Sequence, residues 1–187
     1  MPTAKRLRLA GYLAMTSALL TLPWFLFTFN IANRNDPVIR ATEASMLACG
    51  LALLIYLLLT FQQLLHRRYA FHDADKTISL LIQASITQTA ANLLGLAIPE
   101  LAAAVRIFGF IMVVIVGILH MMFGIWLLQL PASLGGMHRP YCCLNIVTGF
   151  ALATILLLPL GILTSAIGDV MLGTIFLQAV APRPGSA

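Results

Sequence analysis

IFGFIMVVIVGILHMMFGIWLLQL, residues 107–130, is a run of 24 residues without Asp, Glu, Lys or Arg, in which His120 interrupts an otherwise almost wholly apolar sequence. A helix that crosses the roughly 30 Å hydrocarbon layer of a bilayer needs about 20 mostly apolar residues. The stretch therefore predicts a transmembrane helix. It also places an imidazole near the middle of the membrane.

The composition of the whole chain agrees with a membrane location. Of its 187 residues, 60% are hydrophobic and 9% are charged, and the mean hydropathy is +0.97. Soluble domains carry about 25% charged residues, so these residues cannot build a water-facing surface. The apolar runs are continuous rather than alternating, which favours helices over a β-barrel.

The hydropathy pattern predicts an all-α polytopic membrane protein, with one domain over residues 1–181. We expect the bundle of five transmembrane helices to be followed by a short amphipathic C-terminal segment and a disordered tail at 182–187. Pro159 interrupts the last span, and Asp169 makes a sixth crossing the less favoured alternative to an extended fifth helix or an interfacial segment. The spans are expected at about 7–29, 44–65, 77–98, 107–130 and 143–165.

The distribution of Lys and Arg predicts the orientation. Five spans with a cytoplasmic N-terminus put seven of the eleven basic residues on the inner side and four on the outer side. The positive-inside rule therefore predicts a multi-pass inner-membrane protein with its N-terminus in the cytoplasm and its C-terminus outside. The net charge of +5 is explained by attraction to anionic lipid. We therefore expect the lipid bilayer as a partner, and no nucleic acid.

Small residues predict where the helices pack. His120 shares one face of its helix with glycines at spacings of three and four residues. Glycine lets two helices approach closely in lipid, so this face should contact another helix. The glycines predicted to lie at helix contacts are Gly109, Gly117, Gly124, Gly149 and Gly161.

The third predicted span carries several polar side chains, which form an intramembrane cluster with His120. Because these side chains lie on two sides of the helix, we expect it to sit centrally, with a hydrogen bond between His120 and Gln88 or Asn92 at matching depth. The pair is either a structural contact or part of a proton, ion or ligand pathway. The cluster consists of His120, Gln88, Asn92, Gln83 and Thr87.

Cofactor and metal signatures are weak. His120 has no second histidine at its depth, which argues against a bis-histidine haem. His66, His72 and His138 are weak candidates for metal ligands, because their spacing matches no known metal motif. We find no catalytic constellation, and we expect neither a cofactor nor an enzymatic activity.

The sequence leads to two hypotheses about function. In the first, this small membrane protein acts by association, as a scaffold or accessory subunit of a membrane complex or as a homo-oligomer. In the second, it is a small transporter or channel with a polar route along the third and fourth helices. A polar cavity would favour the second hypothesis, and dry packing with mutually bonded side chains the first.

Overall fold

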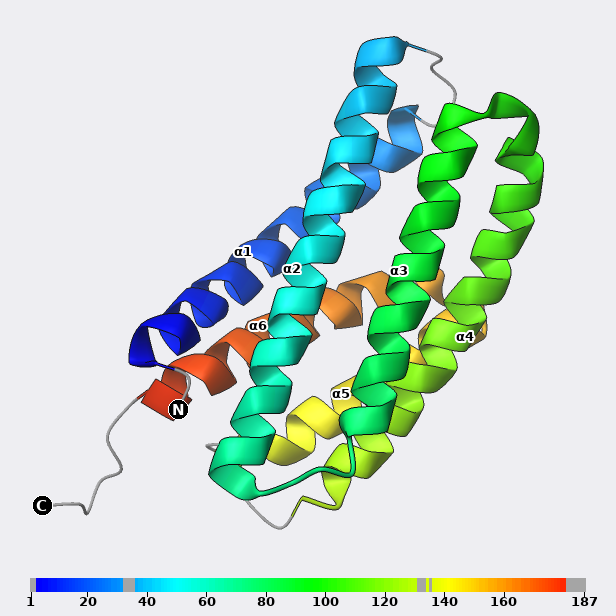
Figure 1. The fold of residues 1–187 in the computed structure, drawn as a ribbon. Coiled ribbons are helices and arrows are strands. Elements are labelled where there is room, and N and C mark those ends of the chain that lie inside the picture. Colours follow the sequence, from blue (N-terminus) through cyan, green and yellow to red (C-terminus); the bar gives the residue numbers. More distant parts are fainter. Residues whose placement is uncertain (1–2, 32–35, 131–133, 135, 181–187) are drawn as a thin grey trace, which may run out of the picture.

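The computed structural model describes residues 3–31, 36–130, 134 and 136–180, without the side chains of residues 22 and 27–31. Residues 182–187, predicted as a disordered tail, lie outside this part. The described chain is an all-α bundle (Figure 1), in which five helices are long and apolar enough to span a membrane. The elements are α1 (Ala4–Ile31), α2 (Pro37–Tyr69), α3 (Asp75–Ala97), the short 3-10 helix η1 (Pro99–Leu101), α4 (Ala102–Leu128), α5 (His138–Ala153) and α6 (Leu158–Val180).

Helix α2 is the longest element, and local signals set its ends. The Asp36 carboxylate accepts a hydrogen bond from the backbone N–H of Val38, and Pro37 occupies the first turn. Both residues are typical of helix starts. The helix ends at Tyr69, and the left-handed backbone of the next residue, Ala70 (φ +49°), lets its N–H bond to carbonyl oxygens of the last turn. Its 33 residues extend over about 50 Å at 1.5 Å per residue, which exceeds the hydrocarbon thickness.

The predicted fifth span at 143–165 is wrong, because the chain reverses inside it. Helix α5 ends at Ala153, and Pro159 lies in the first turn of α6, where its missing N–H breaks no helical bond. The turn contains Ile155 at φ +56°, a left-handed conformation that is rare for a β-branched residue. The predicted C-terminal segment is instead the second half of α6, which is the fifth span-length helix. Helix α5 covers only about 24 Å.

Helices α1 and α6 run side by side in opposite directions (Figure 1). A Cβ added at Gly173 would lie 2.8 Å from the carbonyl oxygen of Gly11, so the two backbones nearly touch. The Arg68 guanidinium, near the end of α2, donates a hydrogen bond to the Ala179 carbonyl. The end of α6 therefore lies at the same end of the bundle as the start of α1. The sequence predicted termini on opposite sides of the membrane. In the structure, the turn between α5 and α6 instead brings the end of α6 back to the end of the bundle where α1 starts.

Four of the five predicted packing glycines lie at close helix contacts. Gly117 and Gly124 of α4 face α5, and Gly149 of α5 faces Gly117, at distances where an added Cβ would meet backbone atoms. Gly161 packs against Leu152 in the α5–α6 turn region. Gly109 has nothing within 4 Å of an added Cβ, so it lies at no close contact with the described residues.

The position of α3 differs from the prediction. Helix α3 packs against α2 and α4 at one side of the bundle rather than at its centre (Figure 1). The centre is an aromatic cluster from four other helices, in which Phe61 of α2 contacts Phe123, Tyr141 and Phe176 edge-on at 5.9–6.3 Å between ring centroids. Such edge-on contacts between aromatic rings are favourable. Bulky apolar residues thus occupy the place that the prediction gave to the polar helix.

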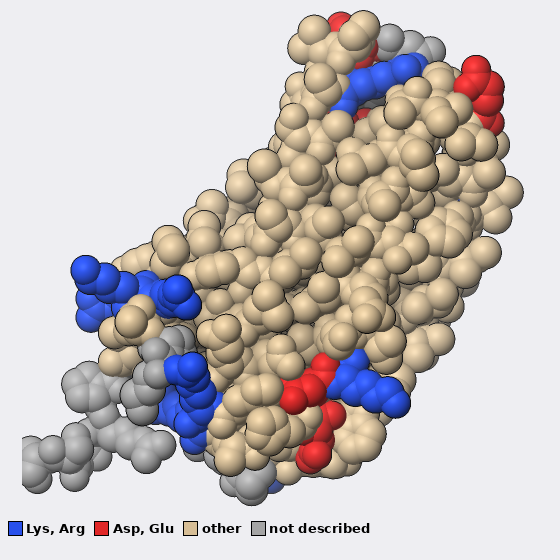
Figure 2. Space-filling model, in the orientation of Figure 1, with Lys and Arg blue, Asp and Glu red and all other residues tan. Residues whose placement is uncertain are grey.

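Basic residues are concentrated at one end of the bundle (Figure 2). This end, called the basic end below, holds the start of α1, the α2–α3 connection, the start of α5 and the end of α6. Among the described residues, the opposite end has Arg40 and Arg106. The basic end carries Lys5, Arg6, Arg8, Arg67, Arg68, Lys76 and Arg139.

Candidate functional site

His120 lies on the face of α4 that packs against α5. Gly117, three residues before it, and Gly124, four residues after it, allow the two backbones to approach. The Nδ1–H of His120 donates to the carbonyl of Val116 at 2.9 Å. With Nδ1 as the donor, Nε2 is the acceptor nitrogen of a neutral imidazole. Among the described residues, Nε2 has no hydrogen-bond partner.

The predicted bond between His120 and Gln88 or Asn92 is absent from the described part of the chain. Gln88 lines a separate groove of about 250 Å³ between α1, α2 and α3. Asn92 is half-buried, while Gln83 and Thr87 are exposed. The prediction was wrong because α3 presents its polar residues toward the rim and toward α2, whereas His120 faces α5.

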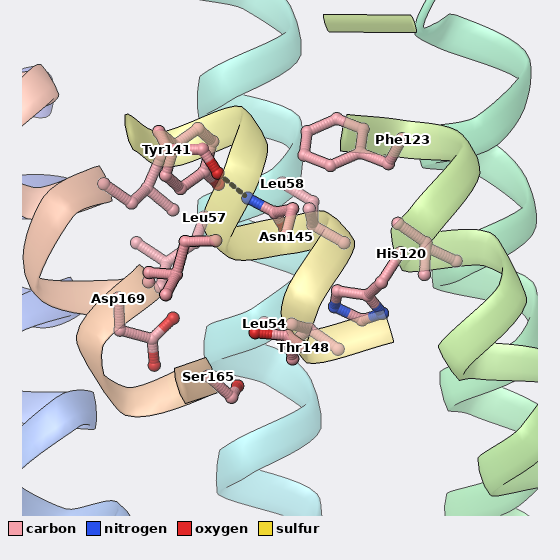
Figure 3. A pocket seen from close by; sticks show the side chains of 14 residues that line it. Leu54, Leu57, Leu58, His120, Phe123, Tyr141, Asn145, Thr148, Ser165 and Asp169 are labelled. Atoms are coloured by element: carbon pink, nitrogen blue, oxygen red, sulfur yellow. Dashed lines mark hydrogen bonds between the residues drawn. The ribbon is translucent and has the colours of Figure 1, made fainter. Parts of the chain in front are cut away.

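A partly enclosed cavity of about 80 Å³ lies beside His120 (Figure 3). Polar side chains from three helices line it, and leucines of α2 lie across from them. About 10–15 Å³ of such volume holds one water molecule, so the cavity has room for a few waters or a small cation. The polar residues in its wall are His120 of α4, Asn145 and Thr148 of α5, and Ser165 and Asp169 of α6.

Asp169 is the acidic side chain of this cavity. Its Oδ2 accepts a hydrogen bond of 2.9 Å from the hydroxyl of Ser17 on α1. The cavity has no Lys or Arg in its wall, and within the described residues Asp169 forms no ion pair. A carboxylate charge at this depth is costly unless a proton or a cation neutralises it. The cavity therefore combines a carboxylate without a cationic partner and an imidazole with a free acceptor nitrogen.

The remaining polar side chains of the wall come from α5 and α6. The Asn145 amide donates to the Tyr141 carbonyl at 2.9 Å, within α5 (Figure 3). Ser165 and Asp169 stand four residues apart on α6, so both face the same side of that helix. The α5–α6 turn brings the two helices together and thereby places both polar pairs around one space.

Sequence reasoning missed most of this site. It found His120 but did not assign Asn145 or Thr148 of α5 to a site. Ser165 and Asp169 were also left out of the predicted site, because α6 was not recognised as a full helix; Asp169 could be buried only if the last stretch folded back. A signal was present in the sequence. Asp169 interrupts a long apolar run that begins near Leu158, and Ser165 precedes it by one helical turn. Read as a span, this run would have pointed to a buried carboxylate.

The three histidines outside the membrane interior separate into two places. His66 and His72 lie together with Asp75 at the α2–α3 connection. The Nε2 of His138 instead bonds to the Leu127 carbonyl at 2.7 Å, which links the start of α5 to the end of α4.

The chain matches no protein-family model, no curated protein and no solved structure.

Proposed function

We propose that this protein is a small transporter or channel that moves protons or small cations across the membrane. The observation that carries the proposal is the cavity between α4, α5 and α6. Asp169 and His120 both line it, and no Lys or Arg does. An ionisable side chain inside a membrane is expensive and usually marks a substrate or proton route. The role of Asp169 in this proposal is to bind the cation or proton, and that of His120 is to relay it.

The bonding of the two groups supports these roles. Because the Nδ1–H of His120 is held by Val116, the free Nε2 is oriented as a proton acceptor, and neutral imidazole is suited to proton transfer near neutral pH. Asp169 keeps one oxygen for a ligand while Ser17 bonds to the other. The small volume favours a proton, a bare cation or a hydronium-sized species over a larger solute.

The charge asymmetry supports an orientation for this transporter. Seven basic residues at the basic end, against Arg40 and Arg106 among the described residues at the other, favour a cytoplasmic basic end. The starts of α1 and α5 and the end of α6 would then all face the cytoplasm of a cell with this protein in its inner membrane. Cysteine accessibility in intact cells, measured at Thr3 and Asp36 after substitution, tests this orientation.

Flux through purified protein in liposomes tests the proposed function. A pH-sensitive dye inside the vesicles should report proton movement driven by a potassium diffusion potential, and cation-sensitive dyes should report other ions. Asp169→Asn, which keeps the size of the side chain and removes its charge, should abolish the movement. Asp36→Asn is the matched control, because Asp36 is exposed and asparagine also caps helices. Equal flux in wild type and Asp169→Asn would reject the proposal.

Association is the second candidate, and exposed polar residues on α3 favour it. Ser79, Gln83 and Thr87 are spaced four residues apart and are exposed on one side of a span-length helix. Polar side chains of this kind hydrogen-bond between helices in membranes, so this stripe suits a second copy or another membrane protein. Gln83→Leu should weaken self-association in a mild detergent, measured by cross-linking, and Gln63→Leu on α2 serves as the control.

A further inference from the structure

The α2–α3 connection brings together, at the basic end, three side chains of the kinds that ligate metals in proteins. Gln62 and His66 lie four residues apart on the last turns of α2, so they share a face. The left-handed cap at Ala70 then reverses the chain toward α3. His72 lies in the connection and Asp75 is the first residue of α3.

Burial fixes this connection in position. Phe71 is 7% exposed and Ala74 is 1% exposed, so residues on both sides of His72 are anchored in the apolar core. The backbone N–H of Asp75 bonds to the His72 carbonyl at 3.0 Å. The relative positions of His72 and Asp75 are therefore set by the backbone before any ligand binds.

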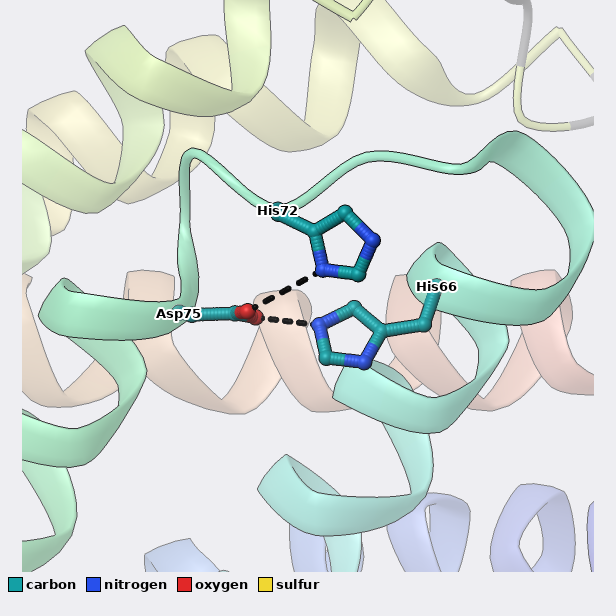
Figure 4. A group of neighbouring side chains, drawn as sticks. All are labelled: His66, His72 and Asp75. Carbon is teal, nitrogen blue, oxygen red and sulfur yellow. Dashed lines mark hydrogen bonds and ion pairs between the residues drawn. The ribbon is translucent and has the colours of Figure 1, made fainter.

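The donor atoms of the three side chains converge (Figure 4). The His66 Nε2 lies 2.5 Å from Asp75 Oδ1, and the His72 Nδ1 lies 3.4 Å from Asp75 Oδ2. All three donor positions lie within 4.8 Å of one another. In a tetrahedral site with metal–ligand bonds of 2.0–2.1 Å, the donors are about 3.3 Å apart. Modest rotations of the imidazoles would therefore bring all three donors to bonding distance from one ion.

The arrangement of the imidazoles favours an ion between them. Their ring centroids are 4.2 Å apart and each ring aims a nitrogen at a different oxygen of the same carboxylate. A bound cation would accept one ring nitrogen lone pair from each imidazole and one oxygen lone pair from the carboxylate.

Gln62 supports the Asp75 carboxylate, and the cluster is accessible from the aqueous side. The Gln62 amide donates to Asp75 Oδ1 at 3.0 Å, which is the kind of outer hydrogen bond that orients a metal-binding carboxylate. The side chain of His72 is 64% exposed, so an ion can reach the group from the aqueous side.

We propose that His66, His72 and Asp75 form a binding site for a divalent transition-metal ion of the zinc type. Two imidazoles and one carboxylate suit zinc and its neighbours better than magnesium or calcium, which prefer oxygen ligands. Three protein ligands leave at least one coordination position for water. The site is separate from the cavity beside His120, and it does not depend on the proposed transport function.

Zinc titration of the full chain in detergent tests this proposal. The protein should be purified without a polyhistidine tag, stripped with a chelator and titrated with Zn²⁺ by calorimetry, with Co²⁺ absorption as a second readout of coordination. We expect one ion per chain. His72→Ala should lower the affinity at least tenfold, because the exposed side chain can be removed without disturbing the core. Gln62→Ala should lower the affinity by about tenfold through loss of the outer hydrogen bond.

Two controls separate this site from other zinc-binding groups. His138→Ala should leave both the stoichiometry and the affinity unchanged, because that histidine bonds to Leu127 and lies outside the cluster. Gel filtration and circular dichroism of each variant show whether it is folded. Failure of the intact chain to bind micromolar zinc would overturn the proposal, as would unchanged binding in a folded His72→Ala/Asp75→Asn double variant.

Discussion

At the basic end of the bundle, the imidazoles of His66 and His72 contact the carboxylate of Asp75 directly, whereas in the interior His120 and Asp169 only share a cavity. The outer three groups satisfy one another at the edge of the aqueous phase. In the interior, the imidazole bonds to its own helix and the carboxylate bonds to Ser17. The same two residue types thus form a mutually paired cluster at the surface and a site with unused bonding capacity in the interior.

The difference between the two sites follows from how far apart in the sequence their residues lie. The outer cluster forms within a short segment around one tight connection, so local geometry brings its members together. The inner site needs three helices, and its geometry depends on the close approach of α4 and α5 at Gly117 and Gly149. The inner site should therefore be sensitive to helix packing, while the outer cluster should not.

The largest expected effect comes from disrupting that close approach. In Gly149→Val, a Cβ would lie 2.6 Å from the backbone nitrogen of Met121, where neither helix can yield without separating. We expect a loss of ~3 kcal/mol in unfolding free energy, at the upper end for overpacking. Thermal unfolding in detergent measures it. Gly109→Ala, where an added Cβ meets nothing within 4 Å, is the control, and an equal loss in both variants would contradict this explanation.

The next largest effect is expected on ion flux, and it distinguishes His120 in the interior from His72 in the outer cluster. His120→Leu should reduce cation flux in liposomes by about tenfold. This corresponds to ~1.4 kcal/mol, the size of one hydrogen bond between the His120 imidazole and a transported proton carrier or cation. The dependence of flux on pH should also flatten, because the relay nitrogen is gone. His72→Leu, the same change in the outer cluster, should leave flux unaffected. If both variants lose flux equally, the two regions do not have distinct roles.

The smallest effect concerns the connection that holds the outer cluster. Ala70 adopts φ +49°, which glycine reaches without a Cβ penalty. Ala70→Gly should stabilise the protein by about 0.5 kcal/mol, after allowing for the greater entropy of unfolded glycine. The midpoint of thermal unfolding should rise by about 1–2 °C for a chain of this size. A fall in the midpoint would show that the cap conformation is not strained for alanine.

The lengths of the apolar runs in the sequence were sufficient to predict most of the fold. Long apolar runs predicted an all-α membrane bundle with five span-length helices, and the structure confirms it. The start of α2 was also predictable, because Asp36 and Pro37 are local signals that act through neighbouring backbone atoms. These features depend on the length of each apolar run and on hydrogen bonds between residues close in the sequence. Both can be recognised from the sequence alone.

The errors arose where packing between distant segments decides the outcome. The α5–α6 turn consists of Thr154, Ile155, Leu156 and Leu157, so a single threonine is its only polar residue and no Gly, Asn or charged residue marks the reversal. The lateral position of α3 was mispredicted because its polar side chains were expected to be buried among other helices, whereas Gln83 and Thr87 are exposed. His120 and Asp169 line one cavity because of the reversal between α5 and α6. Since that reversal was not predicted, the candidate site was found only in part.

Infrared difference spectroscopy of the Asp169 carboxyl tests the central claim most directly. If the cavity connects this group to protons or cations in solution, wild-type protein in lipid should show a protonated-carboxyl C=O band that disappears as the pH is raised or a permeant cation is added. The band should be missing from Asp169→Asn and retained in Asp36→Asn. An Asp169 signal that stays constant across pH and added cations would mean that the group is sealed from solution, and it would contradict the proposed route.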